Sequence, residues 1–174
     1  VIASRRALPD RLAGVTLRAM TPERLDAVRT ALLRDMTIDI VTLGARSGEL
    51  RTTEIWYVVV DGRIYLCGTP GAGEDEREYA PRDWIANLKA HPEFRFVLKE
   101  SIDETLDARA VIVTDSDERR RVFSADVTGW YRRQTGSLEA LVEHGPMVRV
   151  DLLGSAAGLD LTTAGTVPSP REVP

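Results

Sequence analysis

Two runs of β-branched and aromatic residues flank the dipeptide Asp61-Gly62, and this arrangement constrains the fold more than any other part of the chain. The first run spans 53–60 and the second 63–68. Asp-Gly is among the strongest short signals for a two-residue hairpin turn, because both turn residues must adopt a positive φ. Residues of the flanking types favour strands. The sequence therefore predicts an antiparallel β-hairpin near the middle of the chain.

Four further strands and four helices are expected around this hairpin. The first helix has Thr21 as a candidate N-cap and Pro22 at its first position, which is a typical helix start. Strands joined mostly by short hairpins and interrupted by helices predict a mainly β (α+β) fold, a six-stranded antiparallel barrel with flanking helices. The additional strands are expected at 38–43, 93–99, 107–115 and 146–153, and the helices at 21–36, 81–91, 115–125 and 137–145.

A single domain is expected from the length of the chain. Its 174 residues, 43% of them hydrophobic, suffice for one real core and are few for two. We predict one domain over 1–153, including the N-terminal helix. The segment 154–174 is rich in Gly, Ala, Ser, Thr and Pro and is expected to be a flexible tail, or to pack across a partner subunit.

Charge and cysteine content exclude several classes of function. The net charge of −4 argues against a nucleic-acid binder, so any anionic ligand must be held by local cations. Cys67 is the only cysteine, which predicts a cytoplasmic protein without an internal disulfide. His91 and His144 lack a metal-ligand spacing, and no apolar run is long enough to span a membrane. The basic run 119–121 is expected on a solvated helix face.

Cations and hydroxyls gather immediately before the hairpin. Two arginines that flank one tight turn can bind a phosphate through paired hydrogen bonds, and the hairpin beyond them can supply an apolar wall for a flat ring. The alternative is a surface hairpin whose polar residues keep an exposed loop hydrated. The candidate coenzyme-binding residues of this stretch are Arg46, Ser47, Gly48, Arg51, Thr52 and Thr53.

The turn and the helix that follows the hairpin resemble the signature of the split-barrel flavin and deazaflavin reductases. This superfamily includes the pyridoxamine-phosphate-oxidase-like proteins and the deazaflavin-dependent nitroreductases. The matching residues are Gly44, Arg46, Ser47, Gly48, Arg51 and Thr52 in the turn, and Trp84, Asn87, Leu88 and Pro92 in the helix. The chain departs from the pattern at Glu54 and Ile55, which replace the usual Pro and Leu, and in the long acidic loop 70–80.

The resemblance implies a split barrel and a hydride-transfer reaction. The coenzyme would be deazaflavin (coenzyme F-420), with FMN as the alternative, and it would lie near the interface of a homodimer. In such a dimer the basic run 119–121 could instead reach the partner's coenzyme tail. Reduced coenzyme would pass hydride to a small electrophilic organic molecule. A non-catalytic split-barrel module that binds flavin, haem or another flat ligand is the alternative function.

Five further residues are candidates for the site, each with a structural alternative. The resemblance places Trp84 and Asn87 near the coenzyme; Trp84 could instead anchor its helix to the core, and Asn87 could cap a neighbouring loop. Tyr57, Tyr65 and Tyr131 are candidate catalytic residues that could donate a hydrogen bond or a proton, although tyrosines also pack on barrels. Residues 55, 57 and 59 are expected on one face of their strand and 56, 58 and 60 on the other.

Overall fold

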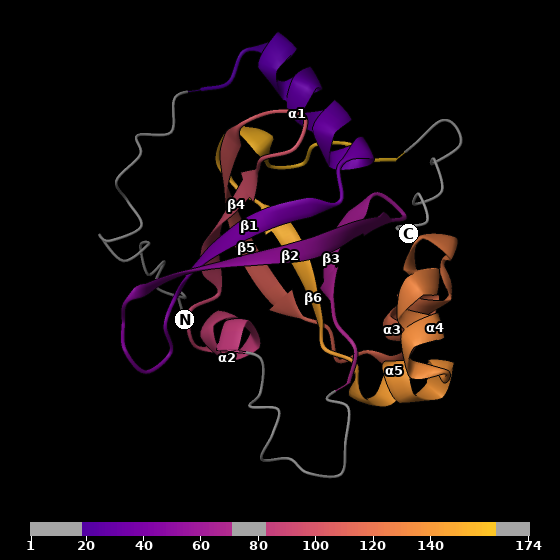
Figure 1. The fold of residues 1–174 in the computed structure, drawn as a ribbon. Helices are drawn as coiled ribbons and strands as arrows, with labels where there is room; N and C mark the ends of the chain where they lie inside the picture. The colour runs from indigo at the N-terminus through magenta and orange to yellow at the C-terminus, as the bar shows by residue number, and fades with distance from the viewer. Residues whose placement is uncertain (1–18, 71–82, 163–174) are drawn as a thin grey trace, which may run out of the picture.

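The structure is a computed structural model that describes residues 19–70 and 83–162. Six strands form a closed antiparallel barrel in the order β1-β2-β3-β6-β5-β4, which confirms the predicted fold class (Figure 1). All six predicted strands are present. Their bounds are β1 (Thr37–Leu43), β2 (Leu50–Val60), β3 (Arg63–Cys67), β4 (Glu93–Leu98), β5 (Glu104–Ile112) and β6 (Met147–Leu152).

Helices surround the barrel. In Figure 1, α1 lies at one end of the barrel, α2 lies toward the other end, and α3, α4 and α5 form a group beside β3. The sequence did not predict α4, which begins with a glycine, has no side-chain cap and contains seven residues. The helices are α1 (Pro22–Arg34), α2 (Asp83–Ala90), α3 (Ser116–Ser124), α4 (Gly129–Thr135) and α5 (Leu138–His144), with short 3-10 turns at η1 (Asp126–Thr128) and η2 (Gly154–Ala156).

Strand β2 separates two apolar cores. Tyr57 belongs to the core inside the barrel, whereas Val58 and Val60 belong to a second core that includes residues of α3, α4 and α5. Tyr57 is 3% exposed and Trp56 is 37% exposed, so consecutive side chains point to opposite faces as the strand alternation predicts. The hairpin turn is also as predicted, because Asp61 and Gly62 have φ values of 50° and 72°.

The segment that follows β6 differs from the flexible tail expected for 154–174. Ala156 is 2% exposed and Leu161 is 4% exposed, and both belong to the core inside the barrel. The Nε of Arg29 in α1 donates to the carbonyl of Asp160 at 2.8 Å. The average composition of the tail concealed these few apolar side chains, which are enough to fix 154–162 against α1 and the barrel. Residues 163–174 lie outside the described part of the chain.

We expect Leu161→Ala to lower the free energy of unfolding by about 2 kcal/mol, because it removes a buried side chain at the margin of the core. Leu50→Ala is the matched control, since Leu50 is 47% exposed. Thermal unfolding of both variants measures the difference. Equal melting temperatures would show that 154–162 contributes little to stability.

The basic run 119–121 does not lie entirely on a solvated face. Arg119 is 8% exposed, and its guanidinium donates to four backbone carbonyls at the end of α5 and after β5. The acceptors are the carbonyls of Val113 at 3.0 Å, Leu141 at 3.2 Å, Val142 at 2.5 Å and Gly145 at 2.5 Å. A cation at a helix C-terminus satisfies carbonyls that have no partner within the helix. Arg119 is therefore a structural residue that joins α3 to α5.

Candidate coenzyme site

The turn between β1 and β2 is closed by backbone hydrogen bonds. The amide of Gly44 donates to the carbonyl of Glu49 at 2.8 Å, and the amide of Gly48 donates to the carbonyl of Gly44 at 2.9 Å. Gly48 has a φ of 65°, which a residue with a side chain adopts only with strain. The hydroxyl of Ser47 accepts from the amide of Glu49 at 3.2 Å and so stabilises the turn itself.

Arg46 and Arg51 are exposed cations of this turn and of the strand that leaves it. Several arginines elsewhere are neutralised, as Arg109 is by Glu93 at 2.6 Å and Arg24 by Glu104 at 2.6 Å. Within 19–70 and 83–162, the side chains of Arg46 and Arg51 make no hydrogen bond or ion pair. Their donors are therefore available to an anionic ligand.

The register of β1 and β2 divides the predicted binding residues between two faces. In this register Arg51 pairs with Thr42, and Thr53 pairs with Ile40. The side chains of Thr42 and Ile40 in β1 are buried. Directly opposed residues of an antiparallel pair share a face, so Arg51 and Thr53 lie on the face that continues into the barrel interior. Thr52 lies on the other face, two residues away from Glu54 and four away from Trp56.

One edge of β2 is open beside this turn. β2 pairs with β1 from Leu50 to Trp56, whereas its pairing with β3 begins only at Tyr57. In the described residues, the edge of β2 over 50–56 thus has no strand opposite β1. Exposed strand edges present unpaired backbone donors and acceptors. A ligand that lies along this edge can contact residues of both faces, which brings Arg51 and Thr52 into one site.

Asn87 ties helix α2 to the same turn. Its Oδ1 accepts from the amide of Ala45 at 2.8 Å, and its Nδ2 donates to the hydroxyl of Thr42 at 3.0 Å. Trp84, one turn earlier in α2, is 5% exposed and belongs to the barrel core. These contacts match the structural alternatives for both residues: Trp84 anchors the helix, and Asn87 caps the loop.

An aromatic surface that the sequence did not identify lies on the outer face of β2. The rings of Trp56 and Trp130 have centroids 5.1 Å apart, and the side chains are 37% and 38% exposed. Trp130 comes from α4, and the only signal for its role was an aromatic pair in an unassigned segment, Trp130 and Tyr131. The two indoles form an apolar surface on the same face as Thr52.

Glu54, which replaces the usual proline of the resembling proteins, has a cationic partner. Lys99 forms ion pairs with Glu54 and with Asp39, the latter at 2.7 Å. These carboxylates raise the pKa of Lys99 by accepting its hydrogen bonds. Because Lys99 is shared by two carboxylates, it reduces the negative charge of Glu54 beside the turn without cancelling the charge of the pair. Only the first residue of the acidic loop 70–80 belongs to the described part of the chain, because residues 71–82 lie outside it.

The structure does not bring the three candidate tyrosines together. The Tyr57 hydroxyl lies inside the barrel and donates to the carbonyls of Ala31 and Leu32 at 3.3 and 3.2 Å. Tyr65 lies in the second core and donates to Glu118 at 2.9 Å, and Tyr131 donates to the carbonyl of Cys67 at 3.2 Å. Burial raises the pKa of Tyr57 and, together with Glu118, that of Tyr65. Each hydroxyl already has a protein acceptor.

Neither a metal centre nor a membrane helix is found in the described residues. No group of three or more His, Cys, Asp or Glu side chains within 19–70 and 83–162 has the arrangement of a metal site. No helix in the same ranges is both long and apolar enough to cross a bilayer.

Solved structures with the same architecture define the class of the fold. The chain is similar to a protein of the pyridoxinephosphate oxidase family related to general stress protein 26 from Clostridium acetobutylicum, with a TM-score of 0.55, 10% identity and coverage of 75% of this chain and 84% of that one. It is also similar to a FAD-binding protein from Mesorhizobium loti, with a TM-score of 0.52, 15% identity and coverage of 79% and 93%. A conserved hypothetical protein from Mycobacterium tuberculosis has a TM-score of 0.50, 20% identity and coverage of 78% and 84%. The fold is a split β-barrel.

Within this class, the sequence identifies the family. The model of the F420H(2)-dependent quinone reductase family matches residues 20–141. This range includes the β1–β2 turn, the open edge of β2, helix α2, and the exposed Trp56 and Trp130. The chain belongs to this family. No curated protein matches the sequence.

Proposed function

We propose that this chain is a reductase that uses reduced deazaflavin, coenzyme F-420, to reduce a quinone or a similar small electrophile. The observation that carries the proposal is the pair of unpartnered arginines, Arg46 and Arg51, beside an open strand edge that leads to an exposed aromatic surface. The family name indicates both the coenzyme and the quinone. FMN is the alternative coenzyme, because it shares a phosphate tail and a flat ring.

The residues of the site fit such a coenzyme. Arg46 and Arg51 offer planar guanidinium groups, which match phosphate and carboxylate geometry. Gly48 and the hydroxyls of Thr52 and Thr53 complete the polar end of the site, and Trp56 with Trp130 provides the apolar end. The polar end thus suits the anionic tail, and the indole surface suits a flat ring. Asn87 supports this arrangement indirectly, by holding the turn in place.

The protein would contribute binding, orientation and exclusion of water. When bound, the reduced deazaflavin supplies the hydride. Arg46 and Arg51 would fix its tail, and the two tryptophans would shield the ring from water and hold the electrophile against it. Tyr57, Tyr65 and Tyr131 would have structural roles, because their hydroxyls donate to protein acceptors. We also propose a homodimer, in which the partner would cover part of the open edge of β2.

A non-catalytic role remains the second candidate, and one observation favours it. Tyr57, Tyr65 and Tyr131 all direct their hydroxyls to acceptors within the protein. A module that carries a flat ligand would use the same arginines and tryptophans and would need no proton donor. The reductase and the carrier would bind the same ligand, and only the reductase would oxidise the reduced coenzyme when an electrophile is present.

We expect the protein to bind F-420 and to oxidise its reduced form when a quinone is added. Fluorescence titration measures binding of the oxidised coenzyme, and the recovery of deazaflavin absorbance measures turnover with menadione as the quinone. A reaction without protein is the control for direct reduction. Binding without turnover would support the carrier function, and absence of binding to both F-420 and FMN would contradict the proposal.

A further inference from the structure

A cavity lies between the barrel and the segment that follows β6, on a part of the molecule that the proposed reaction does not use. Its volume is about 410 Å³, which is within the range of small-molecule sites. It forms where the pairing of β3 with β6 ends at Ile64 and Val150, and residues 156–161 pass beside the gap. Arg46, Arg51, Trp56 and Trp130 do not line it.

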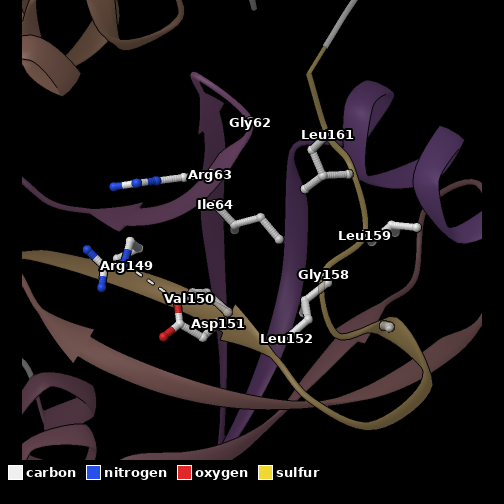
Figure 2. A pocket seen from close by; sticks show the side chains of 11 residues that line it. Gly62, Arg63, Ile64, Arg149, Val150, Asp151, Leu152, Gly158, Leu159 and Leu161 are labelled. Atoms are coloured by element: carbon white, nitrogen blue, oxygen red, sulfur yellow. Dashed lines mark ion pairs between the residues drawn. The ribbon is translucent and has the colours of Figure 1, made fainter.

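The walls of this cavity differ in polarity. Figure 2 shows Arg63 and Arg149 on one side and Gly158, Leu159 and Leu161 on the other. On the second side, Leu161 belongs to the barrel core and Leu159 packs against that core. A ligand that fits both sides must carry an apolar body and a polar head group.

The charges at the cavity favour an anionic head group. Arg149 is compensated twice, since its Nη1 lies 3.3 Å from Glu118 and its Nε lies 3.5 Å from Asp151. Arg63 has a single weak ion pair, with Glu118 at 3.9 Å, and 56% of its side chain is exposed. Glu118 also accepts from Tyr65, so one carboxylate serves three donors. Beyond Glu118 and the neighbouring Tyr65 hydroxyl, the N–H groups of the Arg63 side chain have no acceptor in the described residues.

We propose that this cavity binds a small organic anion, a carboxylate with an apolar body. Its carboxylate lies against Arg63 at the mouth, where a planar guanidinium can donate two parallel hydrogen bonds. Its apolar body lies against the half-buried Leu152 and Leu159 and so removes their surface from water. Arg149, held by Glu118 and Asp151, positions the polar wall.

Calorimetric titration with octanoate tests the proposal, at concentrations below micelle formation. We expect saturable binding of octanoate to the wild-type chain and much weaker binding of the neutral 1-octanol. Arg63→Gln should weaken octanoate binding about tenfold or more, because a hydrogen bond to a charged group is lost. The matched control is Arg121→Gln, since Arg121 also pairs with a single carboxylate, Asp61 at 3.1 Å, and does not line the cavity.

A second variant tests the apolar wall. Leu159→Asp places a carboxylate in the cavity and should abolish octanoate binding, whereas F-420 binding should stay unchanged in every variant. Circular dichroism checks that each variant is folded, and if Leu159→Asp is not, Arg63→Gln decides alone. Lack of saturable octanoate binding, equal affinity of wild type and Arg63→Gln, or equal affinity for octanol would overturn the proposal.

Discussion

Arg51→Ala is expected to weaken F-420 binding about tenfold to hundredfold. The variant removes charge-assisted hydrogen bonds that contribute roughly 1.5–3 kcal/mol. The Arg51 side chain is exposed and makes no hydrogen bond or ion pair in the described residues, so its loss should leave folding intact. Arg51→Lys should restore only part of the affinity, because an ammonium keeps the charge but not the planar fork. Fluorescence titration of F-420 and FMN into each variant measures the effect.

Arg34→Ala is the matched control for this experiment. Arg34 is likewise exposed and without a partner in the described residues, but it lies in the last turn of α1, away from the β1–β2 turn. A specific phosphate contact predicts normal coenzyme affinity in this variant. If Arg51→Ala, Arg51→Lys and wild type bind both coenzymes equally, Arg51 only keeps the loop hydrated and the proposed site is wrong.

Arg119→Met is expected to lower the free energy of unfolding by about 3 kcal/mol or more. The methionine fills part of the space but leaves buried carbonyls without donors, and each unsatisfied acceptor costs about 1–3 kcal/mol. A loss of this size lowers the melting temperature by roughly 6–12 °C in a chain of this length. Arg119→Lys should recover part of the stability, since an ammonium has fewer donors in a different geometry.

The neighbouring arginine provides the control for this second experiment. Arg120 makes an exposed ion pair with Glu139 at 2.6 Å, and exposed pairs contribute little. Arg120→Met should therefore leave the melting temperature nearly unchanged. If both variants change the melting temperature only slightly, water satisfies the carbonyls at the end of α5 in place of Arg119, and the prediction is wrong.

Local patterns in the sequence were sufficient for most of the fold. Asp61-Gly62 specified its hairpin, because few residues other than these tolerate two consecutive positive φ values. Thr21 and Pro22 specified the start of α1, where the Thr21 hydroxyl accepts from the amide of Arg24 at 3.3 Å. In each case the determining residues are adjacent in sequence, so a single chain was enough to identify them.

Features that depend on contacts between distant residues could not be predicted. Arg119 looks like any arginine of a charged helix until α5 places its carbonyls around the side chain. Trp56 and Trp130 are 74 positions apart in the numbering, and only the packing of α4 beside β2 brings their rings together. The role of Leu161 was likewise hidden by the polar residues around it. The candidate residues of the turn were thus readable from adjacent positions in the sequence, whereas the aromatic surface of Trp56 and Trp130 was not.

The position of β6 has a consequence for how the molecule is made. β6 is the last strand of the described residues, yet it lies between β3 and β5. While a ribosome has not yet produced β6, β3 and β5 each expose an edge, and the barrel core is open to water at that seam. Residues 155–162, which hold α1 through Met20 and Arg29, emerge later still. The nascent sheet thus remains incomplete until β6 and residues 155–162 are released, and during that interval the two free edges are where association with other unfinished chains would begin.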